Sequence, residues 1–294
     1  MAERLPQSCV LDDVVDRLHN RGRLRVWSLV VTIFGDAVMP RGGRIALSSL
    51  QELMDRLRVE PGALRTALSR LAKDHWVLRE RQGRNSFFSL DARGRHAFDQ
   101  ATRRIYAGGS LDWDGSWTVA IAPPGGSETA TDLSVCGFVR VNGGVYLRPE
   151  TKDAPDTGDA LDGMLVIHGS SAEHPETFRT LWPSVEIAKA YRTFIEGFSP
   201  FREALDAGRA FTPIDAMAAR TLMLHDWRRI ALRDPGLPAA LLPANWPGEE
   251  ARDLTRSIYT ALVPASEAWL DTAGLPPQSD PQRFLARFVP QSSR

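Results

Sequence analysis

The order of local structure signals in the first 108 residues constrains the fold of this chain more than any other feature. A helical pattern runs from about Leu24 to Ala37 and ends at Pro40-Arg41-Gly42-Gly43, where a proline and paired glycines break a helix. A short extended piece, Ile45-Ala46-Leu47, follows the break. Ser48 and Ser49 then supply the side chains that cap a helix. The pattern predicts one helix before a short strand and a second helix directly after it.

A third helix and a hairpin come next. Pro61 stands at the favoured first position of a helix, whose buried face carries leucines at positions 64, 68 and 71. Two runs, Trp76–Arg81 and Asn85–Leu90, are predicted strands on either side of the turn Gln82-Gly83-Arg84. Asp91 then caps a longer helix that ends near Gly108.

Helix, strand, helix, helix, hairpin is the element order of a winged helix-turn-helix. In that fold the hairpin is the wing, the helix before it is the recognition helix, and the major groove of B-DNA accepts one α-helix. We therefore expect residues 21–108 to bind double-stranded DNA. The alternative for each arginine taken alone is a solvated helix face. The candidate DNA-contacting residues are Arg65, Thr66, Ser69, Arg70 and Lys73 on the recognition helix, Arg81, Arg84 and Asn85 on the wing, and Arg41 and Arg44 beside them.

The charge distribution supports this expectation, although the total charge does not. The chain carries 36 basic and 36 acidic side chains, and zero net charge argues against a nucleic-acid partner. Residues 21–108, however, hold 17 basic and 8 acidic side chains, a net charge of +9, which leaves −9 for the remainder. The neutral total thus describes neither part of the chain.

The middle of the chain predicts a small mixed domain over residues 112–170. Its strands are expected at Trp117–Ala122, Gly137–Asn142, Gly144–Leu147 and Leu165–His168, with a weak helix at Ser127–Leu133. Asn142-Gly143 is a strong signal for a hairpin turn. The resulting β-α-β-β-α-β order predicts a ferredoxin-like domain. Because such a sheet can pair with a second copy, we expect a homodimer.

The rest of the chain is helical in pattern. Residues 174–290 carry apolar periodicity through Phe178–Trp182, Ile187–Phe194, Ala216–Leu232 and Ala251–Leu262. Residues 1–20 form a leader with a short amphipathic segment. The sequence therefore predicts an α+β protein made of a leader, a winged helix-turn-helix, a ferredoxin-like domain and an α-helical domain.

Three stretches resemble the PaaX family, the repressors of bacterial phenylacetate degradation operons. They are Ser28–Asp36 with Pro40–Gly43, Leu64–Trp76 with Gly83–Ser86, and Leu224–Pro235 with Leu237-Pro238 and Leu242–Gly248. The resemblance implies a dimeric repressor whose N-terminal winged helix binds operator DNA. It also implies that the C-terminal domain senses an acyl-CoA, phenylacetyl-CoA in the family, and that this ligand releases the DNA.

The candidate effector-binding residues lie in the third stretch. His225 and Arg229 share a helix face at i, i+4, and arginines bind the phosphates of an acyl-CoA well. An aromatic acyl group requires an apolar, aromatic-lined pocket. The alternative is that His225 and Arg229 hold helix joints together and that the two tryptophans belong to the core. The full candidate set is His225, Trp227, Arg228, Arg229, Arg233 and Trp246.

An enzyme is the competing function. The middle domain is similar to those of CRISPR-adaptation nucleases, which place a metal-binding aspartate near the end of the first strand. Here Trp117–Ala122 contains no carboxylate, and Asp112 and Asp114 precede the strand. We therefore predict no hydrolysis, and no catalytic residue, metal site or cofactor. A metal-dependent nuclease or an acyl-CoA-processing enzyme with an accessory DNA-binding domain is the alternative function.

The N-terminus and the hydropathy predict a cytoplasmic protein with no membrane partner. MAERLPQS has neither the apolar core nor the cleavage pattern of a signal peptide. No apolar run approaches the roughly 20 residues of a membrane-spanning helix. The two cysteines, Cys9 and Cys136, show no metal-ligand spacing.

Overall fold

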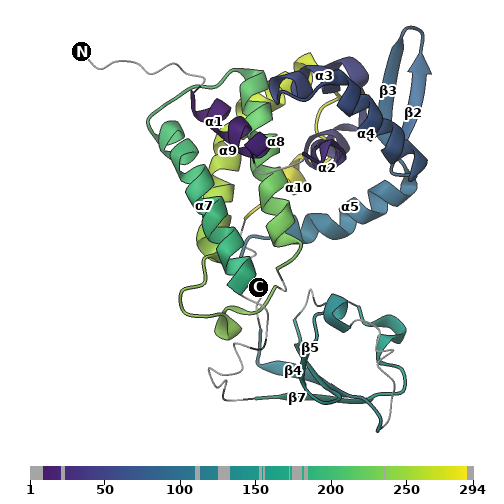
Figure 1. Ribbon diagram of the computed structural model, residues 1–294, viewed down its shortest axis with the longest axis vertical. Helices are drawn as coiled ribbons and strands as arrows, with labels where there is room; N and C mark the ends of the chain where they lie inside the picture. Colours follow the sequence, from purple (N-terminus) through teal and green to yellow (C-terminus); the bar gives the residue numbers. More distant parts are fainter. Residues whose placement is uncertain are drawn as a thin grey trace. The chain divides into compact units, whose positions relative to one another are not determined.

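The computed structural model describes residues 9–20, 24–109, 113–124, 133–151, 154, 156–171, 173, 181, 185–234 and 236–289. Its contacts divide the chain into two compact units. Unit 1 comprises residues 1–108, 191–232 and 250–294, and unit 2 comprises residues 109–190 and 233–249. Helices together with two small antiparallel sheets confirm the predicted α+β class (Figure 1).

Unit 1 begins with two helices and an unusual turn. Helix α1 spans Cys9–Asn20, and helix α2 spans Val26–Ile33. A π-helical turn, η1 (Phe34–Val38), and a 3-10 turn, η2 (Met39–Arg41), continue the helical path of α2 as far as the predicted break. A Cβ atom at Gly35 would collide with the ring of Phe98, so glycine permits the close approach of this turn to helix α5 (Ala92–Ile105).

The next elements follow the predicted order. Strand β1 is Arg44–Ala46, helix α3 is Leu47–Arg56, helix α4 is Pro61–Lys73, the hairpin is β2 (Val77–Gln82) and β3 (Asn85–Leu90), and helix α5 is Ala92–Ile105. The strands form a sheet of order β1-β3-β2. Gly83 takes a positive φ of 60° at the hairpin tip, which glycine adopts without steric cost.

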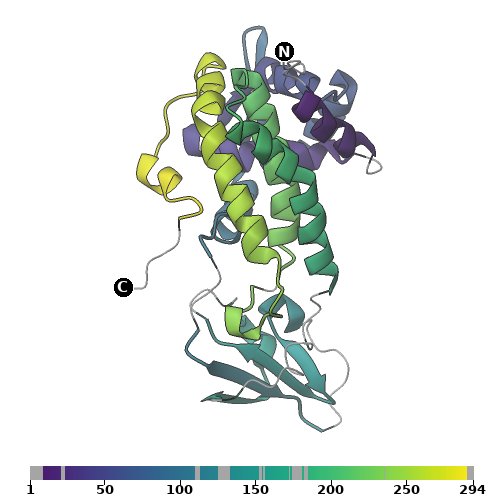
Figure 2. The same ribbon diagram turned by 90° about the vertical axis from the view of Figure 1, so that its left-hand side faces the viewer.

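Long helices from the C-terminal half complete unit 1. Helix α7 spans Val185–Asp206, α8 spans Pro213–Ala231, α9 spans Gly248–Thr272, and α10 spans Pro281–Leu285. In Figures 1 and 2, α7, α8 and α9 run side by side. Helices α7 and α9 continue through Pro200 and Pro264, so the predicted segments Ile187–Phe194 and Ala251–Leu262 are parts of longer helices.

Helix α8 is the centre of unit 1. It contacts α1, α2, α3 and α5, and nearly all of its residues from Ala216 to Ile230 are buried. The N-terminal helices and the C-terminal helices therefore share one core. The compact units do not follow the predicted ranges 21–108, 112–170 and 174–290, which stay predictions about domains.

Unit 2 is built on the second sheet. Its strands are β4 (Ser116–Ile121), β5 (Val139–Asn142), β6 (Val145–Pro149) and β7 (Leu165–Ser170), in the order β5-β6-β4-β7, with all neighbours antiparallel. Three 3-10 turns accompany them, η3 (Leu133–Cys136), η4 (Gly158–Leu161) and η5 (Ala239–Leu241). The predicted helices Ser127–Leu133 and Phe178–Trp182 lie almost wholly outside the described residues.

Each face of this sheet has its own apolar cluster. Ala120 packs with Leu133, Cys136 and Phe138 on one face. Trp117 packs with Leu237, Leu241 and Leu242 on the other. The segment 233–249 therefore belongs to the core of unit 2, although the sequence places it between two helices of unit 1.

Candidate nucleic-acid interface

Helix α4 separates its side chains into a buried and an exposed face. Leu64, Leu68 and Leu71 are buried, as their spacing predicts. The five predicted contact residues of this helix are all exposed: Arg65, Thr66, Ser69, Arg70 and Lys73. They therefore form one polar surface along α4, rich in hydrogen-bond donors.

Three of these side chains interact with neighbouring residues in or directly after α4. Thr66 Oγ1 donates to the Gly62 carbonyl oxygen at 2.9 Å, and Arg65 Nε donates to the Pro61 carbonyl oxygen at 3.2 Å. Arg70 Nε lies 3.7 Å from a carboxylate oxygen of Asp74. Such exposed pairs contribute little to stability, because solvent screens them. The side chains can exchange these partners for a ligand at small cost.

The hairpin presents a second set of arginines. Arg81, Arg84 and Asn85 are exposed, as predicted. In the register of the sheet, Arg79 pairs with Phe88 and Arg81 with Ser86, so both arginines share the face of the buried Val77. Sequence reasoning missed Arg79, although the alternation of Val77, Arg79 and Arg81 along one strand signals it.

Arg44 braces the hairpin. Its guanidinium carbon lies 3.6 Å from the ring centroid of Phe87 on the central strand. Its Nε atom lies 3.2 Å from Glu80, and its Nη2 atom donates to Gln82 Oε1 at 3.1 Å, both on β2. The side chain thus crosses from β1 over β3 to β2, and its donors are already engaged within the sheet.

Arg41 does not lie on this surface. Only 5 % of the residue is exposed, and its guanidinium pairs with Glu267 at 2.9 Å and with Asp271 at 2.7 Å. Both acids belong to helix α9, which is more than 200 residues distant in the sequence. The expectation that Arg41 contacts DNA is therefore corrected: the side chain joins the 3-10 turn after α2 to α9.

His225 and Arg228 join α8 to α2 through hydrogen bonds. Arg228 Nε donates to Thr32 Oγ1 at 2.7 Å, and its Nη2 donates to the Ser28 carbonyl oxygen at 3.0 Å and to Ser28 Oγ at 2.6 Å. His225 Nδ1 lies 3.3 Å from Thr32 Oγ1. Burial, aided by the neighbouring arginines, lowers the pKa of His225 to about 3, so the ring is neutral at physiological pH.

The remaining effector candidates divide between core and surface. Trp227 is fully buried, its Nε1 donates to the Ile105 carbonyl oxygen at 2.7 Å, and its ring packs against Tyr191 and Phe194. Trp246 packs in unit 2 against the Leu237 cluster. Arg229 and Arg233 are exposed. His225, Trp227 and Arg228 therefore contribute to packing in unit 1, and their role in effector binding stays a prediction.

A buried ion cluster that sequence reasoning missed surrounds Asp36 in the π-helical turn. Arg220 Nε donates to Asp36 Oδ2 at 2.6 Å, and Arg287 Nη1 donates to Asp36 Oδ1 at 2.9 Å. The hydroxyls of Tyr106 and Tyr259 donate to Oδ1 at 2.7 and 2.9 Å. Burial alone would raise the pKa of Asp36, but the two arginines outweigh burial and keep that pKa below its usual value.

The acids considered for hydrolysis do not form a metal centre among the described residues. Asp114 is exposed, and its Oδ1 accepts a hydrogen bond from the Ser116 amide at 2.9 Å. Asp112 lies outside the described residues. Within the described ranges, no group of three or more His, Cys, Asp or Glu side chains is placed to hold a metal ion.

These features define an α+β protein with an exposed, donor-rich helix and a basic hairpin, a surface typical of proteins that bind polyanions. Comparison with known families then gives the family. The PaaX-like protein model matches residues 25–94, and the PaaX-like protein C-terminal domain matches residues 182–272. The chain belongs to the PaaX-like family.

A curated relative agrees with this assignment, and a solved structure shows the same fold. Transcriptional repressor PaaX of Escherichia coli K12 is 31% identical over 280 residues, which cover 90% of this chain and 89% of that protein. The solved structure of the uncharacterized protein Rv0674 from Mycobacterium tuberculosis shares the fold. Its TM-score is 0.57 at 22% identity, covering 83% of this chain and 97% of that one. In the described part of the chain, none of the helices has the length and apolar character that a bilayer span requires.

Proposed function

We propose that this protein is a transcriptional repressor that binds double-stranded operator DNA through α4 and the β2–β3 hairpin. The observation that carries the proposal is the exposed row of donors on α4 next to a hairpin with three arginines, Arg79, Arg81 and Arg84. Transcriptional repressor PaaX, with which the chain shares 31% identity along most of its length, supports the same role.

The arrangement of unit 1 supports a winged helix-turn-helix. Helices α3 and α4 are joined by four residues, among which Arg58 has a φ of 56°, and the hairpin follows α4 directly. In such a fold the first residues of α4 would contact base edges, and the wing would contact phosphates or the minor groove. Arg65, Thr66, Ser69 and Arg70 have the side chains for the first role, and the hairpin arginines suit the second.

Unit 2 supports a homodimer. If its strands are numbered one to four along the chain, the observed order is 2-3-1-4, fully antiparallel, which is the order of a ferredoxin-like sheet. Strand β7 lies at one end of that order, and its Leu165 and Ile167 are 61% and 47% exposed. A second copy could cover both through the same strand, as a twofold symmetric interface requires.

We further propose that an aryl-acyl-CoA such as phenylacetyl-CoA releases the DNA. Helix α8 supports this coupling, because it contacts α2 and α5 and so touches the first and the last helix of the proposed DNA-binding domain. Release requires that the ligand bind the DNA-free arrangement more tightly than the DNA-bound one.

A gel-shift titration with the protein's own promoter region tests the proposal. Arg65→Ala and Arg70→Ala should each weaken binding by about 1–3 kcal/mol if these side chains read bases. Arg283→Ala is the matched control, because Arg283 is an exposed arginine on the short helix α10. Absence of binding to this DNA at low salt would reject the repressor function. Loss of affinity with Arg283→Ala as large as with Arg70→Ala would reject the proposed surface.

A further inference from the structure

The segment that follows α9 turns back over unit 1 and inserts three side chains into it. We call residues 276–289 the C-terminal strap, and Figure 2 shows it in yellow as it leaves the end of α9 and turns back through α10. Phe284 and Phe288 are 7% and 1% exposed, and the Arg287 side chain is 9% exposed, whereas most other residues of the strap are exposed. Large aromatic side chains contribute strongly to packing, so these three residues anchor the strap.

The last anchors join α9 to the end of α5 beside the buried Asp36. Arg287 Nη1 donates to the Tyr259 hydroxyl oxygen at 2.6 Å as well as to Asp36, and its guanidinium carbon lies 4.1 Å from the ring centroid of Tyr106. The ring of Phe288 packs edge-on against Tyr106 and Tyr259, with centroid distances of 5.2 and 5.3 Å. The Phe288 amide donates to the Tyr106 carbonyl oxygen at 3.0 Å. Because Tyr106 directly follows α5 and Tyr259 belongs to α9, the strap holds these two helices together.

The start of the strap contacts the turn that precedes strand β1. Ser279 donates to the Pro40 carbonyl oxygen through both its amide and its hydroxyl, each at 2.7 Å. Pro276 Cγ lies 2.9 Å from the place that a Cβ atom at Gly42 would occupy. Strand β1 begins two residues after Gly42 and pairs with β3 of the hairpin. The strap therefore fixes the chain directly before the strand that supports the hairpin.

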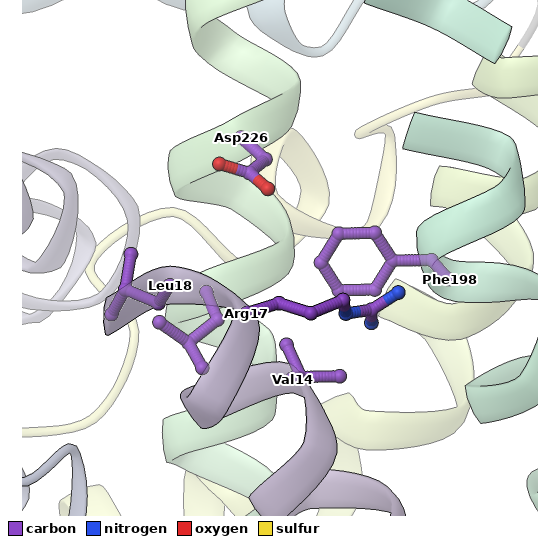
Figure 3. Close-up of a pocket in the computed structure, with 6 residues that line it drawn as sticks. Val14, Arg17, Leu18, Phe198 and Asp226 are labelled. Carbon is purple, nitrogen blue, oxygen red and sulfur yellow. The ribbon is translucent and has the colours of Figure 1, made fainter. Parts of the chain in front are cut away.

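Helix α1 holds a different part of the proposed DNA-binding domain. Asp12 pairs with Arg56 at 3.1 Å and Asp16 pairs with Arg58 at 2.5 Å, at the end of α3 and in the turn after it. Figure 3 shows the other face of α1 against α7 and α8, where the hollow between the side chains has room for about one water. The turn between α3 and α4 is thus held by α1, and the approach to the hairpin is held by the strap.

The hairpin itself has few packing contacts that could fix its position. In β2, Val77 is buried and the other five residues are exposed. An element that is fixed in its binding arrangement beforehand loses less conformational entropy when it binds a ligand. The affinity of the exposed hairpin for DNA should therefore depend on the order of β1 and of the turn before it.

We propose that the C-terminal strap positions the β2–β3 hairpin for DNA binding by fixing the turn before β1 and the end of α5. The inference rests on the proposed DNA-binding function and adds to it a positioning element that does not itself contact DNA. Release of the strap frees β1 and the hairpin to move, so promoter affinity falls. The number of phosphate contacts stays the same, and with it the salt dependence of binding.

Two variants of the full chain test this role. Arg287→Gln with Phe288→Ala removes the last anchors of the strap. Arg283→Gln with Leu285→Ala is the matched control, because it removes an exposed arginine and an exposed leucine from α10. Circular dichroism establishes that both variants are folded. If the anchor variant does not fold, Ser279→Ala gives the same test with a smaller expected effect, since it leaves every contact of Asp36 in place.

Hydrogen exchange and promoter binding give the readouts. In the anchor variant we expect faster exchange of residues 40–46 and 85–90, and wild-type exchange of residues 53–60, which α1 holds. Promoter affinity should fall about tenfold, while the slope of log K against log salt stays at the wild-type value. The control variant should match the wild type in every measurement.

A synthetic peptide of residues 276–289 distinguishes positioning from general destabilisation. Added in excess, it should bind the anchor variant and restore promoter affinity. It should leave the wild type unchanged, because the chain's own strap occupies the site. The same peptide with both anchor substitutions is the control, and equal effects of the two peptides would overturn the proposal.

The remaining outcomes separate the strap from the DNA-binding function. Wild-type exchange of residues 40–46 in the anchor variant overturns the strap, and so does exchange that is equally faster at residues 53–60. Faster exchange of residues 40–46 with wild-type promoter affinity overturns the positioning role. A wild type that binds no promoter DNA rejects the repressor function and this positioning role together, whereas the exchange data then still decide whether the strap orders β1.

Discussion

At the scale of single residues, His225 gives unit 1 an acid-sensitive contact. Its folded pKa of about 3 lies below the value of about 6.5 expected in an unfolded chain, so the unfolded state binds the proton first. The contribution of this residue to stability is complete above pH 6.5. It falls by about 1.4 kcal/mol for each pH unit between 6.5 and 3.

Urea unfolding at several pH values checks this prediction. The unfolding free energy of His225→Gln should lack this dependence, so the difference between the wild type and the variant should shrink as the pH falls from 6.5 to 4. His75→Gln, at an exposed position, is the control. A constant difference across that range would contradict the assignment of a neutral, buried ring.

The buried ion cluster around Asp36 is expected to contribute strongly to the stability of unit 1. Arg220 has no exposed surface and bonds to Asp36, Ser266, Glu267 and Tyr259. Arg220→Met leaves buried acids with fewer partners, so it should cost roughly 3–5 kcal/mol in unfolding free energy. Arg256→Met breaks the exposed pair with Asp253 and should cost about 0–1 kcal/mol. If both variants lost the same unfolding free energy in thermal or urea unfolding, the buried cluster would contribute no more to stability than an exposed ion pair.

Among the secondary-structure elements, the three-stranded sheet holds two arginines with different expected roles, Arg79 on β2 in DNA contact and Arg44 on β1 in the order of the hairpin. Arg79 is exposed, and its Nη2 atom donates to the neutral Ser86 hydroxyl at 3.0 Å, whereas Arg44 is held by Glu80, Gln82 and the Phe87 ring. Arg79→Ala should weaken DNA binding on all sequences and reduce the salt dependence of log K by about 0.9. Arg44→Ala should weaken binding through loss of hairpin order, with a smaller change of that slope. Promoter affinity measured between low and moderate salt distinguishes the two, and equal slopes would contradict the distinction.

The same elements show what local pattern does and does not reveal. Leucine spacing, Pro61 and the glycine turn predicted α3, α4 and the hairpin within a few residues, because each signal is local. Arg41 and Asp36 were misjudged or missed because their partners, Glu267, Arg220 and Arg287, come from the other end of the chain. Asp36 is the one acid between residues 17 and 51, and an isolated acid in an apolar helical run is the signal that could have found it.

In the whole molecule, helix α8 packs residues 224–231 of the C-terminal motif against helices from the N-terminal part of the chain. The sequence expects residues 224–235 to serve an effector-sensing domain, but His225, Trp227 and Arg228 contact Thr32, Ile105 and Ser28 near the proposed DNA-binding elements. The proposed effector-sensing helices and the proposed DNA-binding helices therefore pack in one core, and no separate linker has to connect them. If the proposed effector binds beside α8, it can therefore act on the proposed helix-turn-helix through this shared core.

We predict that two copies of the whole molecule dimerise through strand β7 of unit 2. In the sheet register, Leu165 pairs with Ile121 and Ile167 with Val119, so one face of β7 continues an apolar face of β4. Lysine at both positions 165 and 167 places charge on that face and should convert a dimer to a monomer, because charged edge strands resist pairing. Val185→Lys is the control, since Val185 is 81% exposed in α7.

Sedimentation velocity and promoter binding then measure the consequence. A dimer that contacts two half-sites gains affinity through effective concentration, so Leu165→Lys with Ile167→Lys should lose about 100-fold in affinity for the full operator. Affinity for a single half-site should stay unchanged, because α4 and the hairpin belong to unit 1. A variant that remains dimeric would place the interface elsewhere on the chain. A monomeric variant with full operator affinity would show that each chain binds its half-site independently.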